Sequence, residues 1–133
     1  MQYYNKYLYQ TMRILSIVIL GQTLFFKYSG AKESVYIFQS LGMEPWGRIG
    51  TAILETVAIL LLMFPNFVWL GAGIVINLML GAILSHIVFL GIAVNGDGGL
   101  LFILAIIVFI SSLYLGYCDF YKSPLLRIIS KNR

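Results

Sequence analysis

The sequence has very little charge. Charged residues make up 11% of its 133 positions, whereas about a quarter of the residues in a soluble domain are charged. Hydrophobic residues make up 60%. This composition excludes an ordinary soluble domain and predicts a protein that spans a membrane.

Cysteine and histidine are almost absent. The single cysteine, Cys118, excludes both an intrachain disulfide bond and a CxxC redox pair. The single histidine, His86, leaves too few ligands for zinc, which binds three or four protein side chains. We therefore expect neither dithiol chemistry nor a metal ion within this chain.

The net charge of +4 does not indicate a nucleic-acid-binding protein. The basic residues flank apolar segments and form no continuous stripe of the kind that a phosphate backbone requires. We expect no nucleic-acid partner and attribute these charges to membrane topology.

What the sequence does contain is four long apolar runs. Each is close to the ~20 residues that a membrane-spanning helix needs, and breakers at Pro65-Asn66 and at 95–99 separate the later runs. The predicted spans are 11–29, 46–64, 67–93 and 100–117, followed by a basic tail at 122–133. This pattern predicts an all-α chain that forms one domain over 1–133, a polytopic membrane four-helix bundle.

The segment 30–45, between the first two spans, has an amphipathic pattern. Val35, Phe38 and Leu41 recur at helical spacing, and Gly42 and Pro45 form a plausible stop. We expect a short interfacial helix here, with an unstructured loop as the alternative.

The basic residues also predict an orientation. An even number of spans places both termini on one side, and most of the lysines and arginines are near the termini. Cytoplasmic loops carry the excess of these residues. We therefore predict that both termini are cytoplasmic.

Three polar residues occur inside the apolar runs. By the helical rise, Glu55, His86 and Gln22 lie about 12, 8 and 9 Å from the outer boundary. Arg48 is on the same face of its helix as Glu55, and Lys32 is in the outer loop. Ionisable residues at such depth usually mark functional sites.

We therefore take Glu55, His86, Gln22, Arg48 and Lys32 as candidates for a ligand or proton site. The alternative for Glu55 and His86 is a structural role, in which each forms hydrogen bonds between helices. Asn77 in the third span is expected to join helices in the same way, by meeting Ser111 or Ser112.

The order of these residues resembles that of the DoxX-like family of small bacterial membrane proteins. The resemblance covers about residues 13–117 and rests on the following positions: Gly30, Lys32, Phe38, Leu41-Gly42, Pro45, Gly50, Glu55, Gly81-Ala82 and His86. It implies a four-helix bundle in the bacterial inner membrane. It also places Lys32, Glu55 and His86 where the family tends to keep polar residues.

Relatives in that family include a subunit of a thiosulfate:quinone oxidoreductase, and others act as assembly or accessory proteins. The resemblance therefore implies a redox-associated or quinone-linked accessory subunit, with a quinone as the cofactor and a membrane or redox protein as the partner. The alternatives are a non-catalytic assembly or scaffold subunit, a homo-oligomer and, third, a small-solute carrier. Whether the chain itself is an enzyme stays open.

Overall fold

The computed structural model describes residues 4–120 and 124–132, and all of its regular elements are helical. The elements are α1 (Lys6–Ser29), α2 (Lys32–Ser40), α3 (Trp46–Met63), α4 (Val68–Ser85), the π-helix η1 (His86–Leu90), α5 (Leu100–Asp119) and α6 (Pro124–Lys131). Among the described residues, four helical segments are long and apolar enough to cross a membrane: α1, α3, α4 with η1, and α5. The prediction of an all-α chain with four such helices is confirmed.

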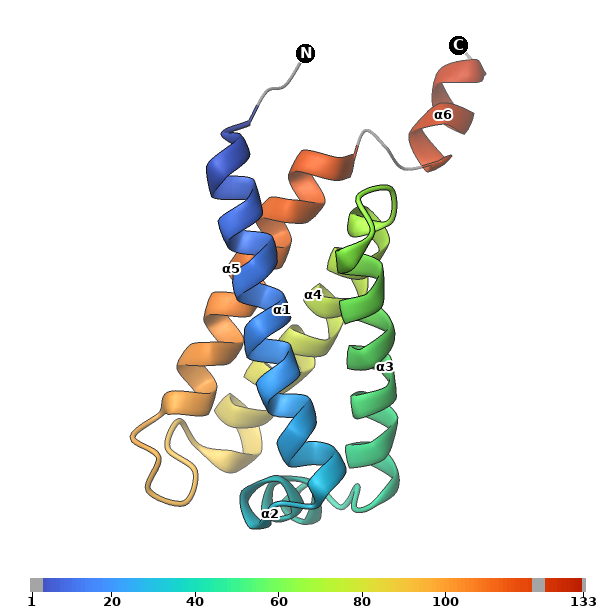
Figure 1. Cartoon of the computed structure of the whole chain (residues 1–133). Helices are drawn as coiled ribbons and strands as arrows, with labels where there is room; N and C mark the ends of the chain where they lie inside the picture. Colours follow the sequence, from blue (N-terminus) through green and yellow to red (C-terminus); the bar gives the residue numbers. More distant parts are fainter. Residues whose placement is uncertain (1–3, 121–123, 133) are drawn as a thin grey trace.

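The four long helices pack in a closed order. α1 contacts α3 and α5, and α4 contacts the same two helices from the other side (Figure 1). Their shared interior contains fully buried apolar side chains from every helix, among them Leu20, Leu62, Val75 and Leu115. Large apolar side chains also cover the outer surface, which suits helices surrounded by lipid.

α3 and α4 pack closely at Gly71. A Cβ atom at this position would lie 3.0 Å from the carbonyl oxygen of Ala58 and 3.1 Å from the backbone nitrogen of Leu62. Glycine is therefore required here by the contact between two backbones, as is common where membrane helices pack closely.

The ends of the helices differ from the predicted ends by a few residues. α1 begins at Lys6 rather than at 11, because the side chain of Asn5 accepts hydrogen bonds from the backbone N–H groups of Tyr7 and Leu8. The third span ends at Leu90 rather than at 93, where Gly91 takes a φ of +80° that stops the helix. α5 continues to Asp119.

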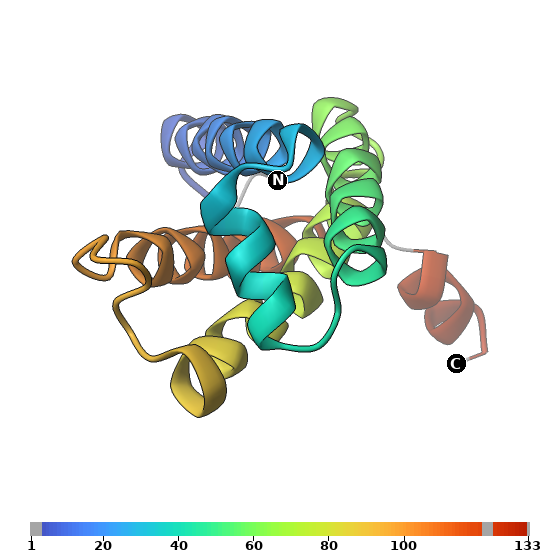
Figure 2. The same cartoon turned by 90° about the horizontal axis from the view of Figure 1, so that it is seen from below.

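α2 lies across one end of the four long helices. Seen from below, it crosses between α1 and α3 on one side and α5 and η1 on the other (Figure 2). Its Ser34 and Phe38 are buried against that end, and Gly42, with a φ of +70°, follows its last turn. A helix therefore occupies the segment for which we expected one, and its position at a membrane interface stays a prediction.

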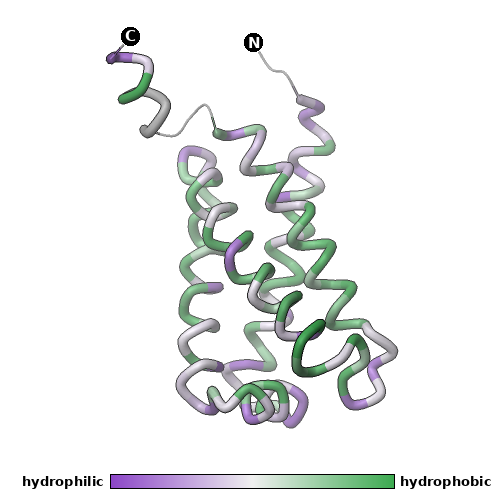
Figure 3. Tube along the Cα trace, turned by 180° about the vertical axis from the view of Figure 1, so that it is seen from behind, coloured by the Kyte–Doolittle hydropathy of each residue, from purple (hydrophilic) through white to green (hydrophobic). Residues whose placement is uncertain are grey.

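Both termini lie at the opposite end of the molecule (Figure 1). Hydrophobic residues dominate the long helices, and hydrophilic residues gather at the two ends (Figure 3). The segment predicted as a basic tail contains a helix, α6, which stands clear of the four packed helices (Figure 1).

Candidate functional site

Glu55 is the most deeply buried of the predicted site residues, with 2% of its surface exposed. It lies on α3 and faces α1, where its carboxylate forms an ion pair with the ammonium group of Lys27. The hydroxyl of Thr23 lies 3.2 Å from the other carboxylate oxygen and shares its hydrogen between that oxygen and the carbonyl of Leu20, at 2.9 Å. A buried carboxylate that holds a cation and a hydroxyl is far less costly than an isolated one. The group therefore joins α1 to α3.

Gln22 does not reach this carboxylate. Its side chain is exposed on the outer surface of α1, whereas Thr23 and Lys27 are four residues apart and share the inner face. Lys27 lies near the end of the first predicted span, and its ammonium group pairs with Glu55. The sequence indicates this pairing in one way. Thr23 and Lys27 are four residues apart, and they lie in the same half of the membrane as Glu55, the only acidic residue of α3.

Arg48 makes its own ion pair within the first turn of α3. Its guanidinium binds the carboxylate of Glu44, with Nε at 2.8 and 3.0 Å from the two oxygens. Its Nη1 donates to the backbone carbonyl of Lys27 near the end of α1. Arg48 therefore fastens the end of α1 to the start of α3 and is directed at Glu44 rather than at Glu55. Lys32, at the first position of α2, is exposed.

His86 lies at the start of η1 and is buried, but it has different neighbours from Glu55. Its Nδ1 is 3.0 Å from the carbonyl oxygen of Gly91, and its ring packs edge-to-face against Phe102. Because a carbonyl can only accept, Nδ1 is the donor in this contact. Within the described part of the chain, no hydrogen bond or ion pair joins His86 to Glu55.

The loop after η1 is organised by Asp97. Its carboxylate accepts hydrogen bonds from the backbone N–H groups of Val94 at 3.0 Å, Gly99 at 2.8 Å and Leu101 at 3.2 Å. These bonds, that of Val94 above all, lower the pKa of Asp97, and the nearby His86 adds to the effect. Asp97 thus fixes the turn that leads into α5, as turn chemistry in the sequence suggested.

A second buried carboxylate was not expected from the sequence. Asp119, the last residue of α5, is completely buried, and the phenol of Tyr9 on α1 donates to it. One turn further along α1, Arg13 donates to the carbonyls of Leu62 and Met63 at the end of α3, at 2.5 and 2.6 Å. Asp119 was missed because it lies two residues beyond the predicted span.

The two buried carboxylates share one feature, which is that α1 supplies the partner of each. Lys27 and Thr23 hold Glu55 midway along α3, and Tyr9 holds Asp119 at the end of α5. Across residues 4–120 and 124–132 there is no group of three His, Cys, Asp or Glu side chains that could hold a metal ion. The arrangement therefore has the chemistry of helix joining.

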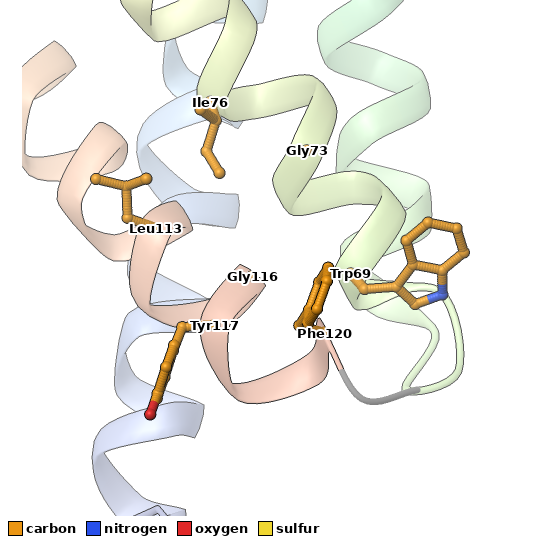
Figure 4. Close-up of a pocket in the computed structure, with 7 residues that line it drawn as sticks. All are labelled: Trp69, Gly73, Ile76, Leu113, Gly116, Tyr117 and Phe120. Atoms are coloured by element: carbon orange, nitrogen blue, oxygen red, sulfur yellow. The ribbon is translucent and has the colours of Figure 1, made fainter. Parts of the chain in front are cut away.

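A groove on the outer surface lies between α4 and α5. It has a volume of about 420 Å³ and is lined by seven residues: Trp69, Gly73, Ile76, Leu113, Gly116, Tyr117 and Phe120 (Figure 4). Tyr117 is 75% exposed, so the groove opens away from the helix interior. A Cβ atom at Gly73 would meet no neighbour within 4 Å. The groove therefore exposes the backbone of α4 at Gly73.

Asn77 lies one turn beyond Gly73 on α4, and its position differs from the one we expected. It is exposed on α4 and donates to the carbonyl of Gly73 at 2.8 Å, so it meets neither Ser111 nor Ser112. Those serines are buried, and Ser111 donates to the carbonyl of Ile107 on its own helix. Asn77 instead presents an amide to the surroundings of α4.

The chain matches no protein-family model, no curated protein and no solved structure.

Proposed function

We propose that this chain is an integral protein of the bacterial inner membrane, with cytoplasmic termini, that serves as a non-catalytic accessory subunit of a larger membrane complex. In this proposal the four long helices form a bundle across the bilayer and α2 lies at the outer interface. The resemblance to DoxX-like proteins and the excess of basic residues near the termini support this placement.

The observation that carries the accessory role is the exposed amide of Asn77. It is the tenth residue of the Val68–Leu90 segment, about 14 Å along a helix that crosses the membrane. Its nitrogen donates to the carbonyl of Gly73, but among the described residues no donor reaches its oxygen; a polar group that enters an apolar medium without a hydrogen-bond partner is costly. Lipid tails offer no such bond, whereas the helix of a partner does.

The α4–α5 groove is the binding site for that partner helix. It is apolar, it runs along two helices, and Gly73, where an added Cβ would meet nothing within 4 Å, allows the backbone of a third helix to come close. The occupant we propose is one transmembrane helix of a partner subunit, which hydrogen bonds to Asn77. Loss of one such bond in a membrane weakens association by about 0.6–1.7 kcal/mol, which is roughly 3- to 18-fold.

The state of Glu55 supports a structural rather than an acid–base role. Its two oxygens are engaged by Lys27 and Thr23, and His86 is engaged elsewhere. A general base needs to reach the proton that it removes, either directly or through one water molecule. A carboxylate held between two helices serves to hold them together.

A quinone-linked role is the second candidate, and the aromatic lining of the groove favours it. The rings of Trp69, Tyr117 and Phe120 border an apolar space of about 420 Å³, and small-molecule sites commonly measure about 300–1,000 Å³. In this version the groove takes the ring of the quinone in place of a partner's helix.

A photo-crosslinking experiment separates the two candidates. A photoreactive residue replaces Leu113 at the groove, and in a control variant it replaces Ile53, which is exposed on α3. Both variants are expressed in bacterial membranes with and without Asn77→Leu. The accessory role predicts one crosslinked membrane polypeptide from position 113, reduced by Asn77→Leu and absent from position 53.

Other products would change the conclusion. A product of twice the mass of this chain would replace the accessory role with a homo-oligomer. Crosslinks to lipid or quinone alone, unaffected by Asn77→Leu, would contradict a partner helix. Purified protein that carries no quinone and shows no thermal shift on adding one would exclude the second candidate.

A further inference from the structure

The helix α6 has the sequence Pro-Leu-Leu-Arg-Ile-Ile-Ser-Lys, which on a helix separates an apolar side from a basic side. It stands clear of the four long helices at the end where both termini lie (Figure 1). Of the side chains that the structure describes, Ile128 and Ile129 are 60% and 57% exposed. Exposing two adjacent isoleucines to water is unfavourable, so we expect this side of α6 to be buried against an apolar surface.

The charge of the chain is segregated between its two ends. Six of its nine basic residues belong to the N-terminal half of α1 or to residues 122–133, and Asp119 is the only one of the five acidic residues near that end. Asp119 is buried with Tyr9. The other end has three basic and four acidic residues. The end that bears α6 therefore has a strong positive field.

We infer that α6 lies in the surface of the membrane leaflet at this end of the molecule and binds the head groups of anionic lipids. Its isoleucine side enters the boundary between head groups and acyl chains, while Lys131 remains at the level of the lipid phosphates. Because Arg127 and Lys131 are four residues apart, they are neighbours on one face of the helix.

Because α6 is basic, we do not expect it to bind in the α4–α5 groove of its own chain. The α4–α5 groove is lined by apolar and aromatic residues and by glycine, so it offers no carboxylate to Arg127 or Lys131. An anionic leaflet offers acyl chains to the apolar side of the helix and negative head groups to its basic side. Each lysine or arginine near such a surface strengthens binding by about fivefold.

The full-length protein can test this inference because its single cysteine is easily replaced. A Cys118→Ser variant receives one new cysteine, Ile129→Cys or the matched neighbour Ser130→Cys, and an environment-sensitive fluorophore is attached. The proteins are reconstituted into phosphatidylcholine bilayers with or without phosphatidylglycerol. Quenching by nitroxide groups on the lipid acyl chains reports whether the label is within the membrane.

We expect the label at position 129 to shift to the blue and to be quenched when phosphatidylglycerol is present, and the label at 130 to stay in water. Arg127→Gln with Lys131→Gln should lower the ratio of inserted to free α6 by about 25-fold, the product of two fivefold effects. Arg127→Lys with Lys131→Arg should retain insertion.

Two results would overturn the inference. One is quenching at position 129 that does not depend on phosphatidylglycerol or on the two basic residues. The other is a blue shift at 129 without quenching from the acyl chains, since this would place α6 against protein. Both readouts concern position 129, so they are independent of whether a partner occupies the α4–α5 groove.

Discussion

Replacing Lys27 with methionine would leave the carboxylate of Glu55 buried with only Thr23 as its partner. Glu55 is 2% exposed and cannot turn to water without separating α1 from α3. Removing one partner of a buried ion pair typically costs about 3–5 kcal/mol. We therefore expect Lys27→Met to reduce the free energy of unfolding by about that amount.

Replacing the other partner of the ion pair, Glu55, should destabilise the protein less. Glu55→Gln keeps a carbonyl oxygen that Thr23 can bind, and the side chain of Lys27 is 16% exposed, so its ammonium group can extend towards the interface. We expect a loss of about 1–2 kcal/mol, near the contribution of a hydrogen bond to a charged group. Lys27→Met combined with Glu55→Leu should lie within about 1 kcal/mol of the native protein, because replacing both partners of a buried pair is often neutral.

Equilibrium unfolding in mixed detergent micelles, followed by tryptophan fluorescence, measures these differences. Lys32→Met is the matched control, because Lys32 is exposed at the start of α2. A loss for Lys27→Met no greater than that of this control would contradict the ion pair. A single Glu55→Leu variant completes the cycle: if the double substitution costs as much as Lys27→Met and Glu55→Leu added together, Lys27 and Glu55 do not interact.

Three further predictions concern other parts of the fold. Because the pKa of Asp97 is lowered, the stabilisation that its carboxylate gives the loop is fully present above the ordinary aspartate pKa and is lost as the pH falls through the lowered pKa. Amide exchange of the Val94 N–H should rise as Asp97 becomes protonated. An Asp97→Asn variant should show no such pH dependence. Tyr9→Phe removes the phenol that donates to the buried carboxylate at the end of α5, and should reduce the free energy of unfolding by about 1–3 kcal/mol in the same micelle assay. Gly71→Ala places a methyl group 3.0 Å from the backbone of α3 and should cost about 1–3 kcal/mol, whereas Gly73→Ala, which meets nothing within 4 Å, should leave the stability of the isolated chain unchanged.

The long helices were predictable because their signals are local. A run of apolar residues near 20 in length, a Pro65-Asn66 turn and a glycine-rich break each act on the segment that contains them. The remaining errors at the ends have local causes too. Asn5 extends α1 towards the N-terminus, and Gly91 ends the third span three residues early.

The partners of the buried polar groups were less predictable, because they depend on how each helix is rotated about its axis. Gln22 and Thr23 are adjacent in sequence but are about 100° apart around α1, so one faces outwards and the other faces Glu55. The depth of Glu55 and His86 could be estimated from sequence position alone. The separation of Glu55 and His86 could not be estimated in this way, because it depends on how three helices pack together.

The supply of both carboxylate partners by α1 has a consequence for synthesis in the cell. A chain is made from its N-terminus, and intramembrane acids are costly until they are paired. Tyr9, Thr23 and Lys27 are translated before Glu55 and well before Asp119. Glu55 and Asp119 therefore each leave the ribosome after a side chain of α1 that binds them, so a partner for each acid is already made when its helix follows.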